Sequence, residues 1–113
     1  MSRQRRYLPS IGQLAAFEAV QRTGSTIAAA KALDLSQGTV SRLVASLEAQ
    51  LGRPLFLRQS KRLVPTPAGI DYARDIAAAL DAIERASMRT AADLGGGALS
   101  LAVLPAFGTR WLG

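Results

Sequence analysis

The sequence contains no cysteine and no histidine. Disulfides, thiolate or imidazole metal sites and Cys or His nucleophilic dyads are therefore excluded, as is proton transfer by imidazole. No apolar run approaches the length of about 20 residues that a membrane-spanning helix needs. The basic start MSRQRR is not followed by the long apolar stretch of a signal peptide. We expect a cytoplasmic protein that is not an enzyme, with no metal, no cofactor and no membrane partner.

Acidic residues are scarce in the first half of the chain. Residues 1–65 contain ten Lys or Arg and three acids, a net charge of +7. Residues 66–113 contain four Lys or Arg and five acids, a net charge of −1. The 113 residues, 49% of them apolar, suffice for one small core. A basic half joined to a nearly neutral one indicates a polyanion-binding unit attached to a segment with another role. The alternative is a basic protein without such a partner.

The segment from Leu33 to Gly52 predicts a tight turn followed by one helix. Its apolar residues recur at helical spacing and form one buried face: Val40, Leu43, Val44, Leu47 and Leu51. Ser36 is expected to cap its start and Gly52 to end it. The opposite face is small, polar and poor in carboxylates: Gln37, Gly38, Thr39, Ser41, Arg42 and Ala45. Such a helix suits a DNA groove, although an amphipathic helix of a small bundle would share the pattern.

The flanking segments favour the DNA interpretation. Residues 25–33 predict a short helix in which Ile27 turns inward, and the three-residue turn 34–36 that follows has the spacing of a helix-turn-helix. Beyond Gly52, residues 57–64 predict two short strands around a basic tip that includes Lys61 and Arg62, the shape of a wing. A narrow, electronegative minor groove is a physical reason for that tip.

The N-terminal region carries two further signals. Ser10 and Gln13 form a predicted capping box at the start of the first helix. Residues 1–6 are expected to be disordered, with Arg3, Arg5 and Arg6 free to lie along phosphates as a loose arm.

Thr66 and Pro67 predict the start of a long helix that runs to about residue 92. Its apolar seam is one helix wide and includes Ile76, Leu80, Ile83 and Ser87. A helix of this length, about 40 Å, exceeds what a small domain covers, so the seam is expected to pair with a second copy; folding back on its own domain is the alternative. Gly95–Gly97 should end the helix, and residues 98–104 are strand-like, as at the opening of a further domain.

The sequence resembles the DNA-binding region of LysR-type transcriptional regulators over its whole length. The residues that carry the resemblance are Leu14, Phe17, Gly24, Ser25, the segment 28–33, Ser36, Gln37, Val40, Ser41, Arg42, Leu47, Glu48, Leu51, Gly52, Leu55, Phe56, Arg58, Thr66 and Gly69. The residues from Gly97 onward and RRYLP near the start are similar to the branch that includes the glycine-cleavage activator.

The resemblance implies a mainly α fold: a winged helix-turn-helix in residues 1–65 with a two-stranded wing, then a linker helix in residues 66–94 that pairs two subunits. Residues 95–113 would be the hinge and first strand of an effector-binding domain, the rest of which is missing, so a small-molecule effector would act only through that missing part. The implied contacts with DNA come from Ser36, Gln37, Gly38, Thr39, Ser41, Arg42, Arg53, Arg58, Lys61 and Arg62. By the resemblance, Gln37, Gly38, Ser41 and Arg42 would meet base edges or nearby phosphates in the major groove.

Among these residues, Arg42 is the expected guanine reader, because its guanidinium can span O6 and N7. Gln37 has the geometry for adenine. Lys61 and Arg62 would reach the minor groove, while Arg53 and Arg58 would serve phosphates and structure.

The resulting hypothesis is a sequence-specific regulator that binds double-stranded DNA at a palindromic promoter site as a homodimer, with pairing of dimers left open. The alternative is a truncated interaction module that pairs through its linker helix with full-length regulators. The carboxylates of Asp71, Asp75, Asp81 and Glu84 are expected to form a solvated helix face and not a catalytic pair.

Overall fold

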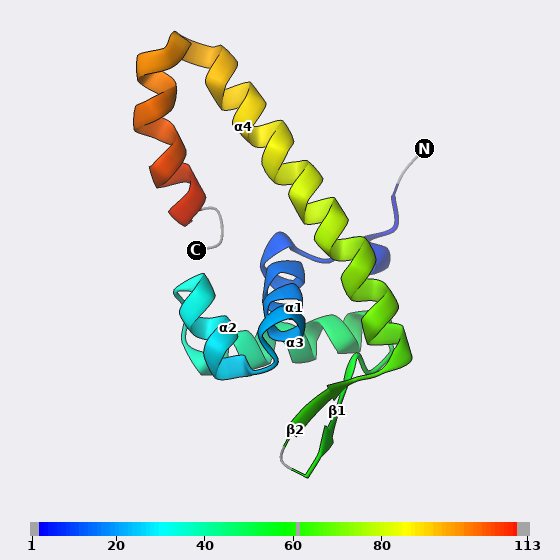
Figure 1. Ribbon diagram of the computed structural model, residues 1–113. Helices are drawn as coiled ribbons and strands as arrows, with labels where there is room; N and C mark the ends of the chain where they lie inside the picture. Colours follow the sequence, from blue (N-terminus) through cyan, green and yellow to red (C-terminus); the bar gives the residue numbers. More distant parts are fainter. Residues whose placement is uncertain (1–2, 61, 111–113) are drawn as a thin grey trace.

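A computed structural model of the chain describes residues 3–60 and 62–110, with side chains described up to residue 92. Its elements are η1 (Arg5–Tyr7), α1 (Ile11–Thr23), α2 (Thr26–Leu33), α3 (Gln37–Leu51), β1 (Phe56–Gln59), β2 (Arg62–Pro65) and α4 (Pro67–Arg110). Helices α1 to α3 form a compact block, the β1–β2 hairpin projects from one side of it, and α4 packs across α1 and leads away from the block (Figure 1). The helix-turn-helix and the wing expected from the sequence are both confirmed.

Local capping sets the helix boundaries. The Ser10 hydroxyl accepts from the Gln13 N–H at 3.1 Å, and the Gln13 side-chain oxygen accepts from the Ser10 N–H at 2.7 Å, so the capping box is present. Ser36 caps α3 by accepting from the Thr39 N–H at 3.1 Å. Gly52 ends α3 with φ of 73°, a conformation that favours glycine. These predictions from sequence are confirmed.

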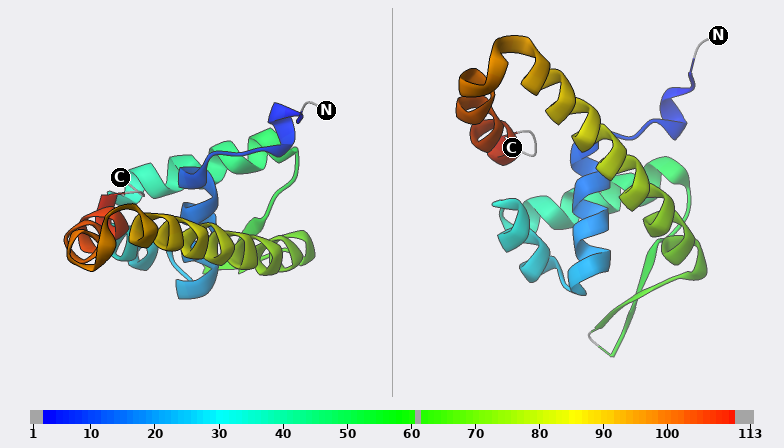
Figure 2. Two further views of the ribbon diagram at one scale, coloured as in Figure 1. Left: turned by 90° about the horizontal axis from the view of Figure 1, so that it is seen from above. Right: turned by 45° about the horizontal axis from the view of Figure 1, so that its top comes forward.

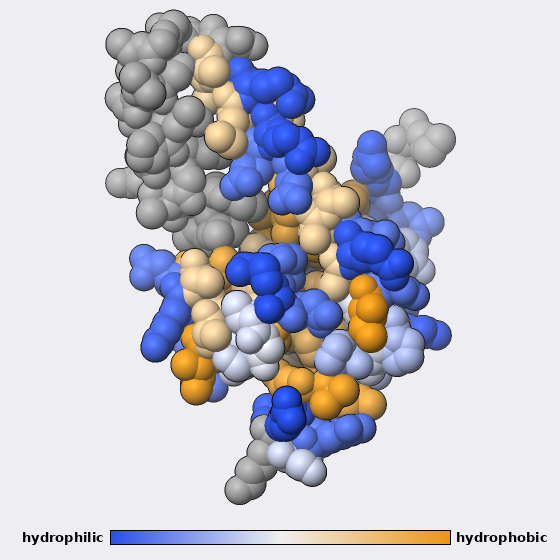
Figure 3. All heavy atoms as spheres, in the orientation of Figure 1, coloured by the Kyte–Doolittle hydropathy of each residue, from blue (hydrophilic) through white to orange (hydrophobic). Residues whose placement is uncertain are grey.

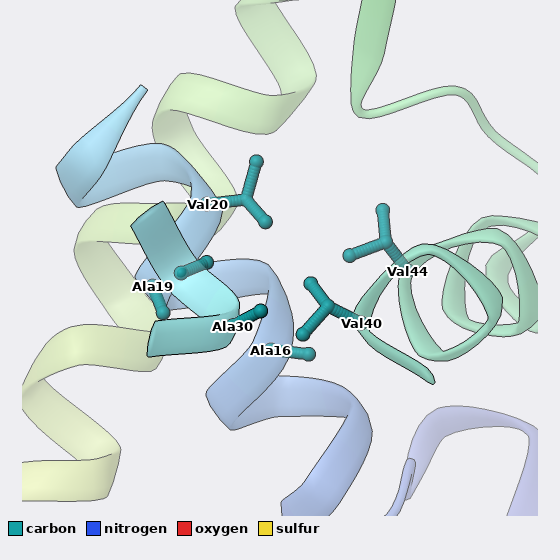
Figure 4. Close-up of a cluster of buried hydrophobic side chains, with 7 residues drawn as sticks. Ala16, Ala19, Val20, Ala30, Val40 and Val44 are labelled. Atoms are coloured by element: carbon teal, nitrogen blue, oxygen red, sulfur yellow. The ribbon is translucent and has the colours of Figure 1, made fainter. Parts of the chain in front are cut away.

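The core consists of two adjoining clusters. One joins α1, α2 and α3 through small side chains (Figure 4), namely Ala16, Ala19, Val20, Ala29, Ala30, Val40 and Val44. The other lies under the hairpin and the start of α4 and contains Phe17, Leu47, Leu55 and Ala73. The Phe17 ring packs against Phe56 and Tyr72, with centroids 5.6 and 5.4 Å away. Burial there raises the pKa of the Tyr72 hydroxyl.

Ile27 does not turn inward, contrary to the expectation from sequence, since its side chain is 56% exposed. Ala29 and Ala30 are the buried residues of α2. At 3.6 residues per turn, Ile27 lies about 110° around the helix from the centre of that buried face. The alanines therefore place α2 against its neighbours, and the first turn of α2 exposes an apolar side chain.

The C-terminal prediction was also wrong. Helix α4 continues through Gly95–Gly97 to Arg110, where a break and a strand over residues 98–104 were expected. A strand needs a neighbouring edge to satisfy its backbone groups, and the described hairpin pairs only β1 with β2. A helix satisfies these groups internally, and Figure 1 shows α4 bending back in its C-terminal part. None of the described helices is both long and apolar enough to cross a membrane.

A close contact joins the hairpin to α4. The Thr66 N–H donates to the Leu55 carbonyl, and the Thr66 hydroxyl donates to the Pro54 carbonyl, both at 3.0 Å. The same hydroxyl accepts from the Gly69 N–H at 3.0 Å and so caps α4. A Cβ added to Gly69 would lie 2.1 Å from the Leu55 carbonyl oxygen. Only glycine permits this approach, which fixes the direction in which α4 leaves the hairpin.

Replacing Gly69 with alanine should therefore destabilise the fold although it raises helix propensity. Overpacking against backbone costs about 1 to 3 kcal/mol, and chemical denaturation would measure the loss. Gly12→Ala is the matched control, because its added Cβ would meet only ordinary contacts at 3.8 and 4.0 Å. We expect the control to be neutral or slightly stabilising. Equal stability of the two variants would contradict this account of the joint.

Candidate nucleic-acid interface

The first turns of α3 present most of the residues predicted to contact DNA. The side chains of Ser36, Gln37, Ser41 and Arg42 are exposed, as is Gly38, while Thr39 is half-buried. At 100° per residue, the exposed side of α3 is centred on Gly38, Arg42, Ala45 and Ala49. We call these four residues the α3 stripe. Its relief is low except at Arg42, so a groove wall could approach the helix closely along most of its length.

The Arg42 side chain lies back along α3 toward the start of the helix. Its Nη2 donates to the Thr39 hydroxyl at 3.2 Å, and Thr39 is in turn 2.8 Å from the Ser36 hydroxyl. Arg42 Nη1 lies 3.4 Å from the position that a Cβ on Gly38 would occupy. Within the described part of the chain, Arg42 forms no ion pair. Its guanidinium is thus oriented by hydroxyl groups and keeps its charge available.

Gln37 is tethered to the preceding helix. Its Nε2 donates to the Thr26 hydroxyl at 3.1 Å, across the turn of the helix-turn-helix. The contact uses one N–H and leaves a second N–H and the amide oxygen for a ligand. Sequence analysis did not identify Thr26 as part of this site, because the pairing depends on the crossing of α2 over α3.

The wing places further basic residues beside α3. The hairpin pairs Leu57 with Val64 and Arg58 with Leu63, and its turn begins at Ser60 with φ of 50°. Arg58 and Arg62 are exposed, whereas Lys61 lies outside the described residues. A groove between the wing and α3 is lined by Val20, Thr26, Ser41, Val44, Ala45, Glu48, Phe56, Arg58 and Leu63. Arg58 and Ser41 therefore share one depression.

Glu48 holds the wing against α3, a role that the sequence analysis missed. Its Oε2 accepts from the backbone N–H groups of Leu55 at 2.7 Å and Phe56 at 3.1 Å. Its own carbonyl accepts from the N–H groups of Gly52 and Arg53. The only signal in the sequence was a single acid within an otherwise carboxylate-free helix. This carboxylate is used internally and does not oppose a polyanion freely.

The remaining predicted residues are dispersed. Arg53 is exposed just beyond the C-terminal end of α3, whereas Arg42 lies near the start of that helix. On α4, Ile76 and Ser87 are half-buried, Leu80 is 9% exposed and Ile83 is 42% exposed. Leu80 is thus already covered within one chain, and Ile83 is the open position of the predicted seam.

The acidic residues of α4 whose side chains are described lie on its surface and not in a cleft. Asp71, Asp75, Asp81 and Glu84 are all exposed, and Asp71 pairs with Arg74 at 2.6 Å. Figure 3 shows hydrophilic residues running along α4 beside a paler stripe. Among the described residues, no group of three or more acidic side chains could hold a metal ion.

A helix-turn-helix whose second helix is followed at once by a two-stranded wing defines a winged helix-turn-helix DNA-binding module. A family signature described as bacterial regulatory helix-turn-helix protein, lysR family, matches residues 11–70. The chain belongs to this family.

Relatives span the same region. The chain is 35% identical over 107 residues to the AhcY transcriptional activator HvrB of Rhodobacter capsulatus, covering 95% of this chain and 37% of HvrB. It is 35% identical over 105 residues to the glycine cleavage system transcriptional activator of Escherichia coli, covering 93% of this chain and 34% of the activator. The chain therefore spans about a third of the length of these curated relatives.

Solved structures show the same fold. The chain superimposes on the structure titled BenM_DBD/catB site 1 DNA complex with a TM-score of 0.69 and 28% sequence identity. The match covers 78% of this chain and 99% of that one, so the whole BenM domain has a counterpart here.

Replacing Glu48 with alanine should loosen the wing. Two buried or half-buried N–H groups would lose their acceptor, at a cost of about 1 to 3 kcal/mol each at most. We expect a lower free energy of unfolding and faster hydrogen exchange at the amides of Leu55 and Phe56. Glu48→Gln, which keeps one acceptor oxygen, is the milder control. Unchanged exchange at both amides in the alanine variant would show that Glu48 does not anchor the hairpin.

Proposed function

We propose that this chain is the DNA-binding part of a sequence-specific transcriptional regulator that places the start of α3 in a major groove. The observation that carries the proposal is the α3 stripe of small residues, on which one arginine is oriented by hydroxyl groups toward the start of the helix. A major groove admits an α-helix, and a low-relief surface lets the helix lie deep in it. The likeness to a domain whose structure was solved with DNA supports the same mode of binding.

Base reading is assigned to the first turns of α3. The guanidinium of Arg42 can donate to O6 and N7 of guanine, and the free amide groups of Gln37 can pair with adenine. Because Arg42 is turned along the helix toward its start, its guanidinium lies beside the turns that would enter the groove. The small polar groups of Ser36, Gly38, Thr39 and Ser41 complete the contact with base edges or nearby phosphates.

Phosphate contacts are assigned to the wing and its surroundings. Arg58 shares the depression between wing and α3 with Ser41, so a backbone phosphate seated there would meet both. Lys61 and Arg62 at the wing turn are proposed to enter the adjacent minor groove, and Arg53 to contact phosphates beyond the far end of α3. These contacts position the protein and carry the salt-dependent part of the affinity.

Two copies are proposed to bind a palindromic site by pairing through α4. Ile83, at 42% exposure, is the open apolar residue of the seam, flanked by the half-buried Ile76 and Ser87. The complete regulator would work in the bacterial cytoplasm and receive a small-molecule effector through a domain beyond this chain. The same exposed residue favours a second candidate function, pairing of α4 with a full-length relative, which would not require DNA.

Replacing Arg42 with alanine should remove discrimination and not merely affinity. Sites selected from fragmented genomic DNA would be compared with scrambled duplexes over a salt series. One lost bidentate contact costs about 1 to 3 kcal/mol of preference per bound chain, so the ratio of the two affinities should fall at least several-fold. Lys61→Ala is the control, expected to weaken both duplexes alike and to reduce the salt slope by about 1. Equal wild-type affinity for both duplexes at every salt concentration would contradict sequence-specific binding.

Introducing a charge at Ile83 should prevent pairing. Ile83→Asp is expected to shift the sedimentation coefficient of the chain from dimer to monomer, because a carboxylate would be desolvated in an apolar seam. Ile70→Asp is the matched control on the same helix, since Ile70 is 48% exposed but lies off the predicted seam. A dimer that survives Ile83→Asp would place the interface elsewhere. A monomeric wild-type chain that pairs only with a full-length relative would favour the second candidate function.

A further inference from the structure

The N-terminal segment is docked on α3 and is not the loose arm expected from sequence. Residues 5–7 form the short helix η1, and its backbone is held by Gln50 near the end of α3. The Gln50 Nε2 donates to the carbonyl oxygens of Arg5 at 3.0 Å and Arg6 at 3.2 Å. The bonds from Gln50 go to backbone carbonyls, so they do not use the arginine side chains. We call residues 3–7 the N-terminal arm.

A chain of amide groups fixes the position of this anchor. Gln13 is buried at 8% exposure, and its Nε2 donates to the Gln50 side-chain oxygen at 3.2 Å and to the Ser46 hydroxyl at 3.0 Å. Its own side-chain oxygen accepts from the Ser10 N–H in the capping box. The cap of α1, the side of α3 and the N-terminal arm are thus connected by one set of hydrogen bonds. The arm therefore occupies a defined place on the domain.

That place is beside the α3 stripe, on the side opposite to the wing. Going around α3, Ser41 and Glu48 lie between the stripe and the wing groove, whereas Ser46 and Gln50 lie between the stripe and the arm. In the view from above, the N-terminal arm lies beside the C-terminal end of α3, on the side away from α4 (Figure 2). The exposed surface of α3 is consequently flanked by basic segments on both sides, by the wing along Ser41–Glu48 and by the arm at its C-terminal end.

The arm carries charge that nothing in the described residues neutralises. Arg3, Arg5 and Arg6 are exposed, and none of them forms an ion pair with a described carboxylate. Arg6 lies near the end of α3, where its Nη2 is 3.4 Å from the position a Cβ on Gly52 would occupy, and its guanidinium is 5.8 Å from the Tyr7 ring centre. A helix C-terminus attracts a cation, and α3 has no basic residue in its last turn. Arg6 thus helps to hold the arm, which leaves Arg3 and Arg5 for a ligand.

We propose that the N-terminal arm is a second phosphate-binding flank, in which Arg3 and Arg5 contact the DNA backbone on the side of the major groove opposite to the wing. This inference rests on the proposed binding of DNA through α3. Because its contacts are to phosphates, the arm adds affinity that is independent of sequence. Gln50 is a positioning residue: it keeps two charges beside the groove that would otherwise be spread over a mobile tail.

The test is a double variant, Arg3→Ala with Arg5→Ala, compared with Arg85→Ala combined with Arg89→Ala on α4, which removes the same charge from exposed residues remote from α3. The probes are a fluorescent duplex containing a selected site and its scrambled version, titrated by anisotropy over a salt series. A plot of log affinity against log salt has a negative slope, and each lost phosphate contact makes it shallower by about 0.9. In the arm variant the magnitude of this slope should therefore fall by roughly 2 per bound chain, and the affinity for both duplexes should fall alike. In the α4 variant both quantities should change little.

A third variant separates docking from charge. Gln50→Met keeps every arginine but removes the donor that holds the carbonyls of Arg5 and Arg6, so it should lower affinity for both duplexes with an effect smaller than that of the double variant. Equal salt slopes for the arm and α4 variants would overturn the proposal. Wild-type affinity in the variant with Arg3→Ala and Arg5→Ala would also overturn it, because the arm would then not contact DNA. The proposed function fails separately, if the wild-type chain binds neither duplex or if Arg42→Ala leaves the preference between them unchanged.

Discussion

Two backbone N–H groups at the start of β1 need an acceptor, and the carboxylate of Glu48 supplies it. A two-stranded hairpin is marginal in water and takes its direction from whatever anchors its base. Here the anchor is a side chain of α3, so the base of the wing is tied to that helix. Leu55 directly precedes β1. Its carbonyl accepts from the Thr66 N–H and is approached closely by Gly69. The direction of α4 is therefore set by the same few atoms that set the direction of the wing.

Small side chains do two separate jobs in this domain. Alanines and valines between α1, α2 and α3 bring the helices close enough to bury a core with few large residues. On the outer side of α3, Gly38, Ala45 and Ala49 leave a surface from which only Arg42 extends. The inner set determines the fold, and the outer set determines how near another surface can come. Larger residues outside would leave the stability of the core unaffected while they keep a groove wall at a distance.

Features that depend on neighbouring residues in the chain could be predicted from the sequence. The caps at Ser10, Ser36, Gly52 and Thr66 are local, and so is the spacing that defines the helix-turn-helix. What could not be predicted depends on how separate elements meet: Glu48 on the start of β1, Thr26 on Gln37, and the N-terminal arm on Gln50. Ile27 was misplaced because apolar character alone does not say which side of a short helix meets the core. Residues 98–104 have strand-like composition, but strand formation requires an edge that the described chain does not supply.

In the wing and the N-terminal arm, α3 holds the backbone and leaves the arginine side chains exposed. This arrangement bears on how affinity and specificity are related. In the proposed mode of binding, the base-reading groups are confined to the first turns of α3, where hydroxyl contacts orient Arg42. In the same proposal, the charges that contact phosphates of any sequence lie to either side, on a wing held by Glu48 and on an arm held by Gln50. Because phosphate contacts raise binding to all sequences together, a change in either flank alters total affinity and its dependence on salt. Discrimination between sequences would stay with α3, so affinity and specificity could vary independently although one helix supports both.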